Sequence, residues 1–137
     1  MRWAILDTSV YIDHWERGLH DDVLNDVRKA FIVRQSAVVL SELRRGARTP
    51  EARRLIEALF RMDKSPWAPT AADWWEAGLK IRTLGDAQRW DLNRRRAFQN
   101  DVLIALTARH HGASVVTANK NDFELLGKEL GISILTV

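Results

Sequence analysis

The chain has 137 residues, of which 46% are hydrophobic, and this length suits one compact domain over residues 1–137 with a sizeable core. Its formal net charge of +3 and its isoelectric point near 9.7 make the surface mildly basic, which allows a nucleic-acid partner without requiring one. With 0 cysteines, disulfide frameworks and cysteine-based zinc sites are excluded, and no apolar run approaches the roughly 18–20 residues of a membrane-spanning helix.

The first expected element is a strand over residues 2–6, because RWAIL is a short apolar run of the kind buried in a parallel sheet. The run stops at Asp7, and Thr8 or Ser9 can cap the helix that follows. In open α/β sheets, ligands bind beyond the carboxyl ends of the strands, so Asp7 lies where such folds place their functional groups. Asp7 also interrupts the apolar run too early for a secretory signal, and we therefore expect a cytoplasmic protein.

Helices and strands are expected to alternate along the rest of the chain. Short helices are predicted over residues 10–17, 21–29 and 121–130, and longer ones after the capping residues Ser36, Thr49 and Thr70. Further strands are predicted at residues 31–33, 114–117 and 132–135. Strands separated by helices indicate βαβ units and therefore a mainly parallel sheet.

The most apolar helix is expected near residue 101. The segment Val102–Leu106 is apolar all round, which predicts a buried helix that ends at the cap residue Gly112. Asp101 is expected to open this helix, where the helix dipole favours an acid. The polar segment 85–98 before it predicts a loop or an irregular helix.

Three acids lie at the polar ends of these expected elements: Asp7, Glu42 and Asp101. Each has an ordinary alternative role, respectively as a turn residue, as the partner of Arg45 in a surface ion pair, and as an acid favoured by a helix dipole. Together they would repel one another unless a cation lay between them. Oxygen ligands without cysteine or suitably spaced histidine favour Mg²⁺ or Mn²⁺ over zinc.

Four segments of the chain resemble those of the PIN-domain ribonucleases, and within that family the VapC-type toxins of bacterial toxin–antitoxin pairs. The segments are residues 6–13 (LDTSVYID), 39–46 (VLSELRRG), 100–105 (NDVLIA) and 116–123 (VTANKNDF). They occur in the order and spacing of the family, whereas residues 50–98 carry no motif. The resemblance implies a single-domain, Rossmann-like α/β/α sandwich with a mainly parallel sheet.

The resemblance also implies a divalent cation, Mg²⁺ with Mn²⁺ as a substitute, for the hydrolysis of RNA phosphodiesters. Asp7 and Asp101 are expected to bind the ion directly, and Glu42 to bind it or to act as a base through water. Asp122 either joins this site or caps the last helix. Many family members carry Asp at the position of Asn119, so the negative charge is lower here, which argues against a second ion unless Asp122 reaches the site.

Polar side chains around the acids are expected to hydrogen-bond them and thereby to orient them: Thr8, Ser9, Thr117 and Asn119. Arginines on either side of the motifs are candidates for contact with the RNA backbone: Arg44, Arg45, Arg94 and Arg95. The alternative for any of these arginines is a solvated polar face.

The chain has 6 tryptophans, a high number for its length. Trp3 is expected to pack inside, whereas Trp74 and Trp75 are neighbours on a helix and cannot share one face. At least one of the two should be exposed or at an interface. The resemblance implies a homodimer and a groove that binds an antitoxin protein, and the alternative is a core rich in large side chains.

Two competing hypotheses remain beside the nuclease. One is a catalytically weakened PIN-like module that binds RNA or protein, for which Asn119 is the supporting feature. The other is a different Mg²⁺-dependent phosphotransfer fold, whose usual Asp-x-Asp after the first strand is absent because Ser9 stands two residues after Asp7.

Overall fold

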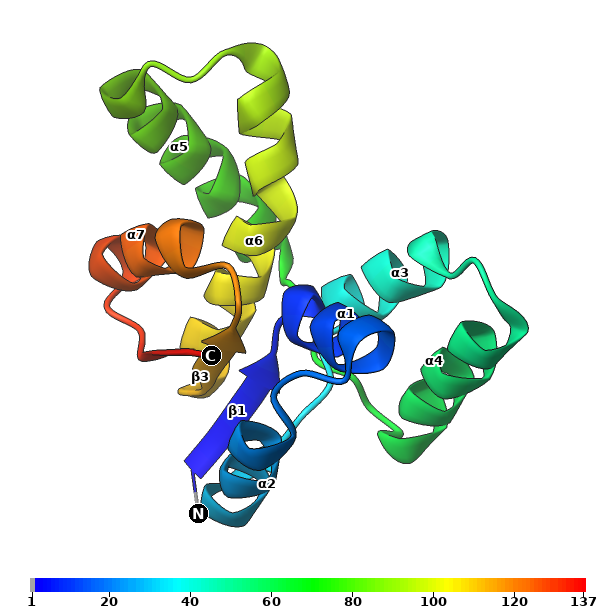
Figure 1. Cartoon of the computed structure of the whole chain (residues 1–137). Helices are drawn as coiled ribbons and strands as arrows, with labels where there is room; N and C mark the ends of the chain where they lie inside the picture. The colour runs from blue at the N-terminus through cyan, green and yellow to red at the C-terminus, as the bar shows by residue number, and fades with distance from the viewer. Residues whose placement is uncertain (1) are drawn as a thin grey trace.

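Four parallel strands form the centre of the molecule, which a computed structural model describes for residues 2–137. Figure 1 labels two of them, β1 and β3. The strands are β1 (Arg2–Leu6), β2 (Phe31–Val33), β3 (Ser114–Thr117) and β4 (Ile134–Thr136). Their order in the sheet is β2-β1-β3-β4, and every neighbouring pair is parallel. The predicted α/β fold with a parallel sheet is confirmed. Because β1 and β3 are neighbours, the segments that follow them leave the sheet side by side.

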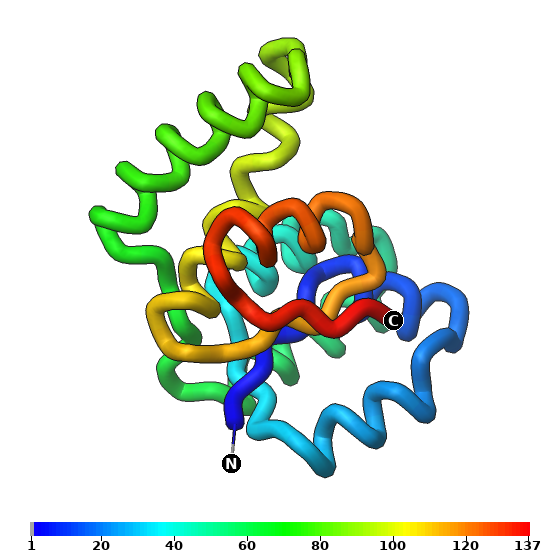
Figure 2. The backbone as a smooth tube through the Cα atoms, turned by 90° about the vertical axis from the view of Figure 1, so that its left-hand side faces the viewer, coloured from blue at the N-terminus to red at the C-terminus, as the bar shows by residue number. Residues whose placement is uncertain are grey.

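The helices within residues 2–137 are α1 (Thr8–Arg17), α2 (Asp21–Ala30), α3 (Ala37–Gly46), α4 (Pro50–Met62), α5 (Ala71–Gln88), α6 (Leu92–His111) and α7 (Lys120–Leu130). Two helix pairs, α3–α4 and α5–α6, form hairpins that project away from the sheet in different directions (Figure 1). Figure 2 shows α5, in green, leading away from the strands before α6 returns to them. None of these helices combines the length and apolar content needed to cross a membrane.

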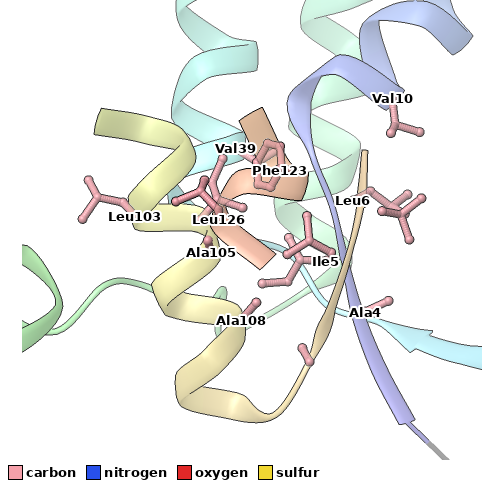
Figure 3. Close-up of a cluster of buried hydrophobic side chains, with 14 of the residues drawn as sticks. Ala4, Ile5, Leu6, Val10, Val39, Leu103, Ala105, Ala108, Phe123 and Leu126 are labelled. Atoms are coloured by element: carbon pink, nitrogen blue, oxygen red, sulfur yellow. The ribbon is translucent and has the colours of Figure 1, made fainter. Parts of the chain in front are cut away.

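The hydrophobic core lies on both faces of β1. Figure 3 shows Ile5 on the side of α6 and α7, whereas Leu6 and Val10 lie on the opposite side of the strand. All three side chains are buried: Ile5 and Leu6 because neighbouring residues of a strand point to opposite, covered faces, and Val10 because α1 packs on one of these faces. On α6 the segment Val102–Ala108 is buried without a break, because α3, α5, α7 and β3 all contact this helix. Helix α6 is therefore the central helix of the fold, and Asp101 stands at the edge of its buried segment.

Three helix starts follow the predicted capping residues. The hydroxyls of Ser36, Thr49 and Thr70 each accept a hydrogen bond from the backbone N–H three residues later. Each such cap contributes about 1 kcal/mol to stability. The predicted end of α6 is confirmed as well, since Gly112 follows it in the left-handed conformation with φ of 65°.

The prediction of a loop or an irregular helix over residues 85–98 was wrong. The segment is helical on both sides of a turn at residues 89–91. The Asp91 carboxylate caps the start of α6, and the Arg95 guanidinium bonds the carboxylate of Asp86 across the turn. These contacts between two antiparallel helices stabilise helical backbone in a sequence that has no apolar periodicity.

Two further predictions need correction. Helix α6 begins at Leu92, so Asp101 lies in its middle and does not open it, and the helix dipole no longer accounts for this acid. Trp3 is 38% exposed, because the first residues of β1 extend beyond the covering helices, and its ring packs against Trp67 with centroids 5.1 Å apart. Trp74 and Trp75 are both exposed, which agrees with their adjacency on one helix.

Candidate functional site

Asp7 is fixed at the junction of β1 and β3. Its backbone N–H donates to the carbonyl of Val116 at 2.8 Å, which continues the ladder between the two strands. One carboxylate oxygen accepts hydrogen bonds from the hydroxyls of Ser9, at 2.7 Å, and Thr117, at 2.9 Å. Asp7 is the N-cap residue of α1 by position, but its side chain makes no capping bond, so the carboxylate is held for another purpose.

Glu42 reaches the same edge of the sheet from α3. The hydroxyl of Thr8 donates to its carboxylate at 2.8 Å, which joins the first turn of α1 to the middle of α3. Thr8 and Ser9 were predicted either to cap α1 or to hydrogen-bond the acids. The second interpretation describes the structure, because each hydroxyl donates to a carboxylate.

Asp101 and Asp122 meet through Asn119. The Asn119 amide donates to one oxygen of each carboxylate, both at 3.3 Å, and so connects α6 with the first turn of α7. Asn119 is the N-cap residue of α7, yet its side chain makes no capping bond. The alternative role predicted for Asp122, as the cap of this helix, is therefore wrong. Asp122 follows the cap by three residues, and its side chain bonds Asn119 and Arg94 instead.

Arg94 contributes a positive charge that the sequence alone did not place. Its guanidinium donates to the second oxygen of Asp122 at 2.5 Å and lies 4.4 Å from the centroid of the Trp90 ring. The pair is separated by 28 positions in the chain. The sequence signal that could have found it is modest: the arginine precedes Asp101 by two helical turns and so lies on the same side of α6.

The neighbouring carboxylates act electrostatically on Asp101. Burial is the main reason that the pKa of Asp101 rises to about 8, and the negative charges of Asp7, Asp122 and Glu42 raise it further. The positive charge of Arg94 lowers this pKa, but by a smaller amount. Burial also raises the pKa of Asp7, although hydrogen bonds from Ser9 and Thr117 favour its charged form. An anionic pocket of this kind is relieved by protonation or by a bound cation.

A family model decides which fold family this architecture represents. The model of the PIN domain matches residues 4–129, which is nearly the whole chain. The chain belongs to the PIN domain family.

Solved structures share this fold. The chain resembles a chain of VapBC-1 from nontypeable Haemophilus influenzae with a TM-score of 0.71 and 20% identity, covering 98% of this chain and 97% of that one. It resembles VapBC-5 from Mycobacterium tuberculosis, a member of the VapBC family of toxin-antitoxin systems, with a TM-score of 0.63, 24% identity and 100% of both chains covered. It also resembles DNA-bound VapBC from Salmonella typhimurium, with a TM-score of 0.62 and 21% identity, covering 99% of this chain and 98% of that one. No curated protein sequence matches this PIN domain.

The donor set of the pocket fits a hard divalent cation. Within residues 2–137 no three His, Asp or Glu side chains converge as a ready-made metal cage. Mg²⁺ does not require such a cage, because it keeps several water ligands and is commonly held by one or two carboxylates. The partly exposed Asp101 and the fixed carboxylate of Asp7 supply oxygens of that kind in this PIN domain.

The remaining candidate arginines lie in two different settings. Arg95 donates to the Trp90 carbonyl and to Asp86, so it joins α5 to α6 and is already engaged within the protein. Arg44 and Arg45 are exposed in the last turns of α3. Arg44 also lines a cavity of about 480 Å³ between α3 and α4.

Proposed function

We propose that this PIN domain is a divalent-cation-dependent endoribonuclease and the toxin of a VapC-type toxin–antitoxin pair. The observation that carries the proposal is the acidic cluster itself: Thr117 fixes the buried Asp7 carboxylate, Asn119 holds Asp101, and burial together with the neighbouring acids raises the pKa of Asp101 to about 8. Such a cluster costs stability unless it binds a cation, which is expected of a functional site rather than of a structural one. Membership of the PIN family and the VapBC relatives support the choice of reaction and partner.

In this proposal Asp7 and Asp101 hold one Mg²⁺, which Mn²⁺ can replace. The bound ion would polarise the scissile phosphoryl group and lower the pKa of a water molecule. Glu42 lies beside Thr8 and is the candidate to receive the proton from that water, directly or through a second one. Thr117 and Ser9 keep the Asp7 carboxylate oriented, and no side chain acts as a nucleophile.

The test is cleavage of labelled RNA with Mg²⁺ or Mn²⁺. The wild-type protein should cut RNA with either ion, and EDTA or the substitution Asp7→Asn should abolish cutting. Asp26→Asn, an exposed acid in the middle of α2, is the matched control and should leave cutting unchanged. If Asp7→Asn cuts RNA as well as the wild type does, the proposed site is wrong.

The toxin assignment has a separate test in cells. Expression of the wild-type chain alone should slow growth, and Asp101→Ala should relieve the effect. Co-expression of a small DNA-binding protein encoded in an adjacent reading frame should also relieve it and yield a stable complex. We place the protein in the cytoplasm on this basis, since its substrate and its partner would both be there.

A binding module without catalysis is the second candidate, and Asn119 is the observation that favours it. An amide at this position donates to Asp101 and Asp122 and so takes up carboxylate oxygens that a second ion would need. The same RNA assay separates the two functions. Binding of RNA without cutting, in the presence of either ion, would favour the module.

A further inference from the structure

We propose that the guanidinium of Arg94 takes the place of a second metal ion in the acidic pocket formed by Asp7, Glu42, Asp101 and Asp122. The site then binds one divalent cation. The arginine supplies the other positive charge that faces the substrate phosphate. The inference rests on the proposed function. It gives Arg94 a direct electrostatic role toward the substrate phosphate, which the other surface arginines do not have.

The first support is the contact itself. The Arg94 guanidinium donates to Asp122 at 2.5 Å, and Asn119 donates to the other oxygen of the same carboxylate. Asp122 is therefore bonded through both oxygens by groups of this chain. A second cation at this carboxylate would have to share its oxygens with these donors and lie beside the positive charge of the guanidinium, which opposes its binding.

The second support is that the guanidinium is held in place and not merely nearby. It lies 4.4 Å from the centroid of Trp90 and 5.3 Å from the centroid of Phe98, and these two rings pack edge to face at 4.7 Å. Trp90 belongs to the α5–α6 turn, where its backbone N–H donates to the Gly85 carbonyl at 2.9 Å. The turn thus positions the aromatic rings, and the rings position the charge.

The third support is that one side of the guanidinium stays open. Arginine has five N–H donors, and the bond to Asp122 uses one of them. The side chain remains 36% exposed, whereas its partner carboxylate is 20% exposed. A planar guanidinium with free donors on its solvent side matches the oxygen pair of a phosphate group.

The charges of the pocket agree with this division of labour. Three carboxylates, those of Asp7, Glu42 and Asp122, lie near enough to act electrostatically on a fourth, Asp101. One divalent cation together with Arg94 leaves the ionised pocket with a single net negative charge, whereas two such ions together with the arginine would make it positive. Replacing Arg94 by a neutral residue should therefore create room and charge for a second ion.

The experiment is isothermal titration calorimetry with Mn²⁺ on the wild type and on Arg94→Ala, Arg94→Lys and Arg96→Ala. Arg96 is exposed and adjacent, so its removal changes the net charge equally without touching the pocket. We expect one bound ion for the wild type, for Arg94→Lys and for Arg96→Ala, and two for Arg94→Ala. RNA cleavage by Arg94→Ala should fall at least about ten-fold at the Mn²⁺ concentration that saturates the wild type, and should recover when more Mn²⁺ fills the second position.

The outcomes separate the two proposals. A wild type that binds no Mn²⁺ would overturn both the metal-dependent function and the role of Arg94. A wild type that binds one ion, with Arg94→Ala also binding one, would overturn the role of Arg94 alone, even if the affinity of that ion changed. Two ions in the wild type would likewise overturn it, because the arginine would then replace nothing.

Discussion

Ionised Asp101 destabilises the folded protein, because its carboxylate is buried beside other acids. In an unfolded chain its carboxyl group ionises near pH 3.8, whereas burial and the neighbouring charges hold its pKa at about 8 in the folded protein. Between these two values the unfolded state carries fewer protons on this group than the folded state does. Stability is therefore expected to fall as the pH rises from about 4 to 8.

Replacing Asp101 by Asn should remove this cost. Without added metal, Asp101→Asn should unfold several degrees above the wild type at pH 8, and the difference should shrink toward pH 4. Thermal unfolding followed by circular dichroism across this pH range measures the effect. Added Mg²⁺ should raise the wild-type midpoint but not that of the variant. Asp26→Asn should follow the wild type at every pH, and a variant less stable than the wild type at pH 8 would contradict the prediction.

Thr117 acts on the site through Asp7 and touches no other acid there. Its hydroxyl donates to the carboxylate at 2.9 Å and favours the charged form of Asp7. Thr117→Val should raise the pKa of Asp7 further and weaken Mg²⁺ binding by about 10-fold or more. Thr107→Val is the matched control, because the Thr107 hydroxyl is equally buried but bonds the Leu103 carbonyl within α6. Calorimetry should find the control unchanged, and equal losses in both variants would indicate a general packing defect.

At the scale of the elements, a contact network joins the end of α4 to the segment after β2. Asp63 accepts hydrogen bonds from the Arg34 guanidinium and from the backbone N–H groups of Gln35 and Ser65. Burial acts to raise the pKa of Asp63, but these bonds outweigh it and place the pKa below the usual value. The contribution to stability is present above about pH 4 and is lost as the pH falls through the folded-state pKa.

Asp63→Asn should therefore destabilise the protein near neutral pH, by about 2 kcal/mol, because it weakens charged hydrogen bonds. Urea unfolding at pH 7 and at pH 3 measures the effect, which should be smaller at the lower value. Glu57→Gln, within α4, removes an exposed ion pair with Arg61 and should cost no more than about 0.5 kcal/mol. If Asp63→Asn lowers the free energy of unfolding equally at both pH values, the carboxylate stabilises this junction through its shape and not through its charge.

Patterns that depend on neighbours in the chain were readable from the sequence. The caps at Ser36, Thr49 and Thr70 were predicted because a capping bond spans only three residues. The polar residues of the α5–α6 hairpin were misread, because their helical state depends on contacts across the turn, such as Arg95 over Gly85. A polar helix stabilised by its neighbour gives no periodic signal in the sequence.

The same distinction applies to the site. Asp7, Glu42 and Asp101 could be proposed from short motifs in a known order, and the structure brings their charges within mutual influence. The spacing of Arg94 to Asp101 places both on one side of a helix but does not identify Asp122 as the partner, because an arginine that faces solvent and one that faces a distant carboxylate look alike in sequence. The bridging role of Asn119 depends on the fold in the same way, since its two partners come from different helices.

At the scale of the whole molecule, α5 presents an apolar surface outside the core. Trp75 is 87% exposed and Leu79, one turn further along the same helix, is 49% exposed. If the homodimer that the family resemblance implies uses this surface, Trp75→Glu should convert the dimer into a monomer in analytical ultracentrifugation. Phe60→Glu, which alters an exposed aromatic residue on α4, should leave the dimer intact. A monomeric wild type would refute the homodimer, and a dimeric Trp75→Glu would place the interface elsewhere.

The order of strands in the sheet bears on synthesis of the chain. Strand β3 lies beside β1 in the sheet, and the hydroxyl of Thr117 bonds the carboxylate of Asp7 although 110 positions of the chain separate them. A nascent polypeptide still lacking Thr117 has only the Ser9 hydroxyl to orient the Asp7 carboxylate, and one lacking Asp122 has only part of the pocket. Prematurely terminated translation products should therefore be inert, and the ribosome would release a competent protein only once its carboxyl-terminal segment had emerged.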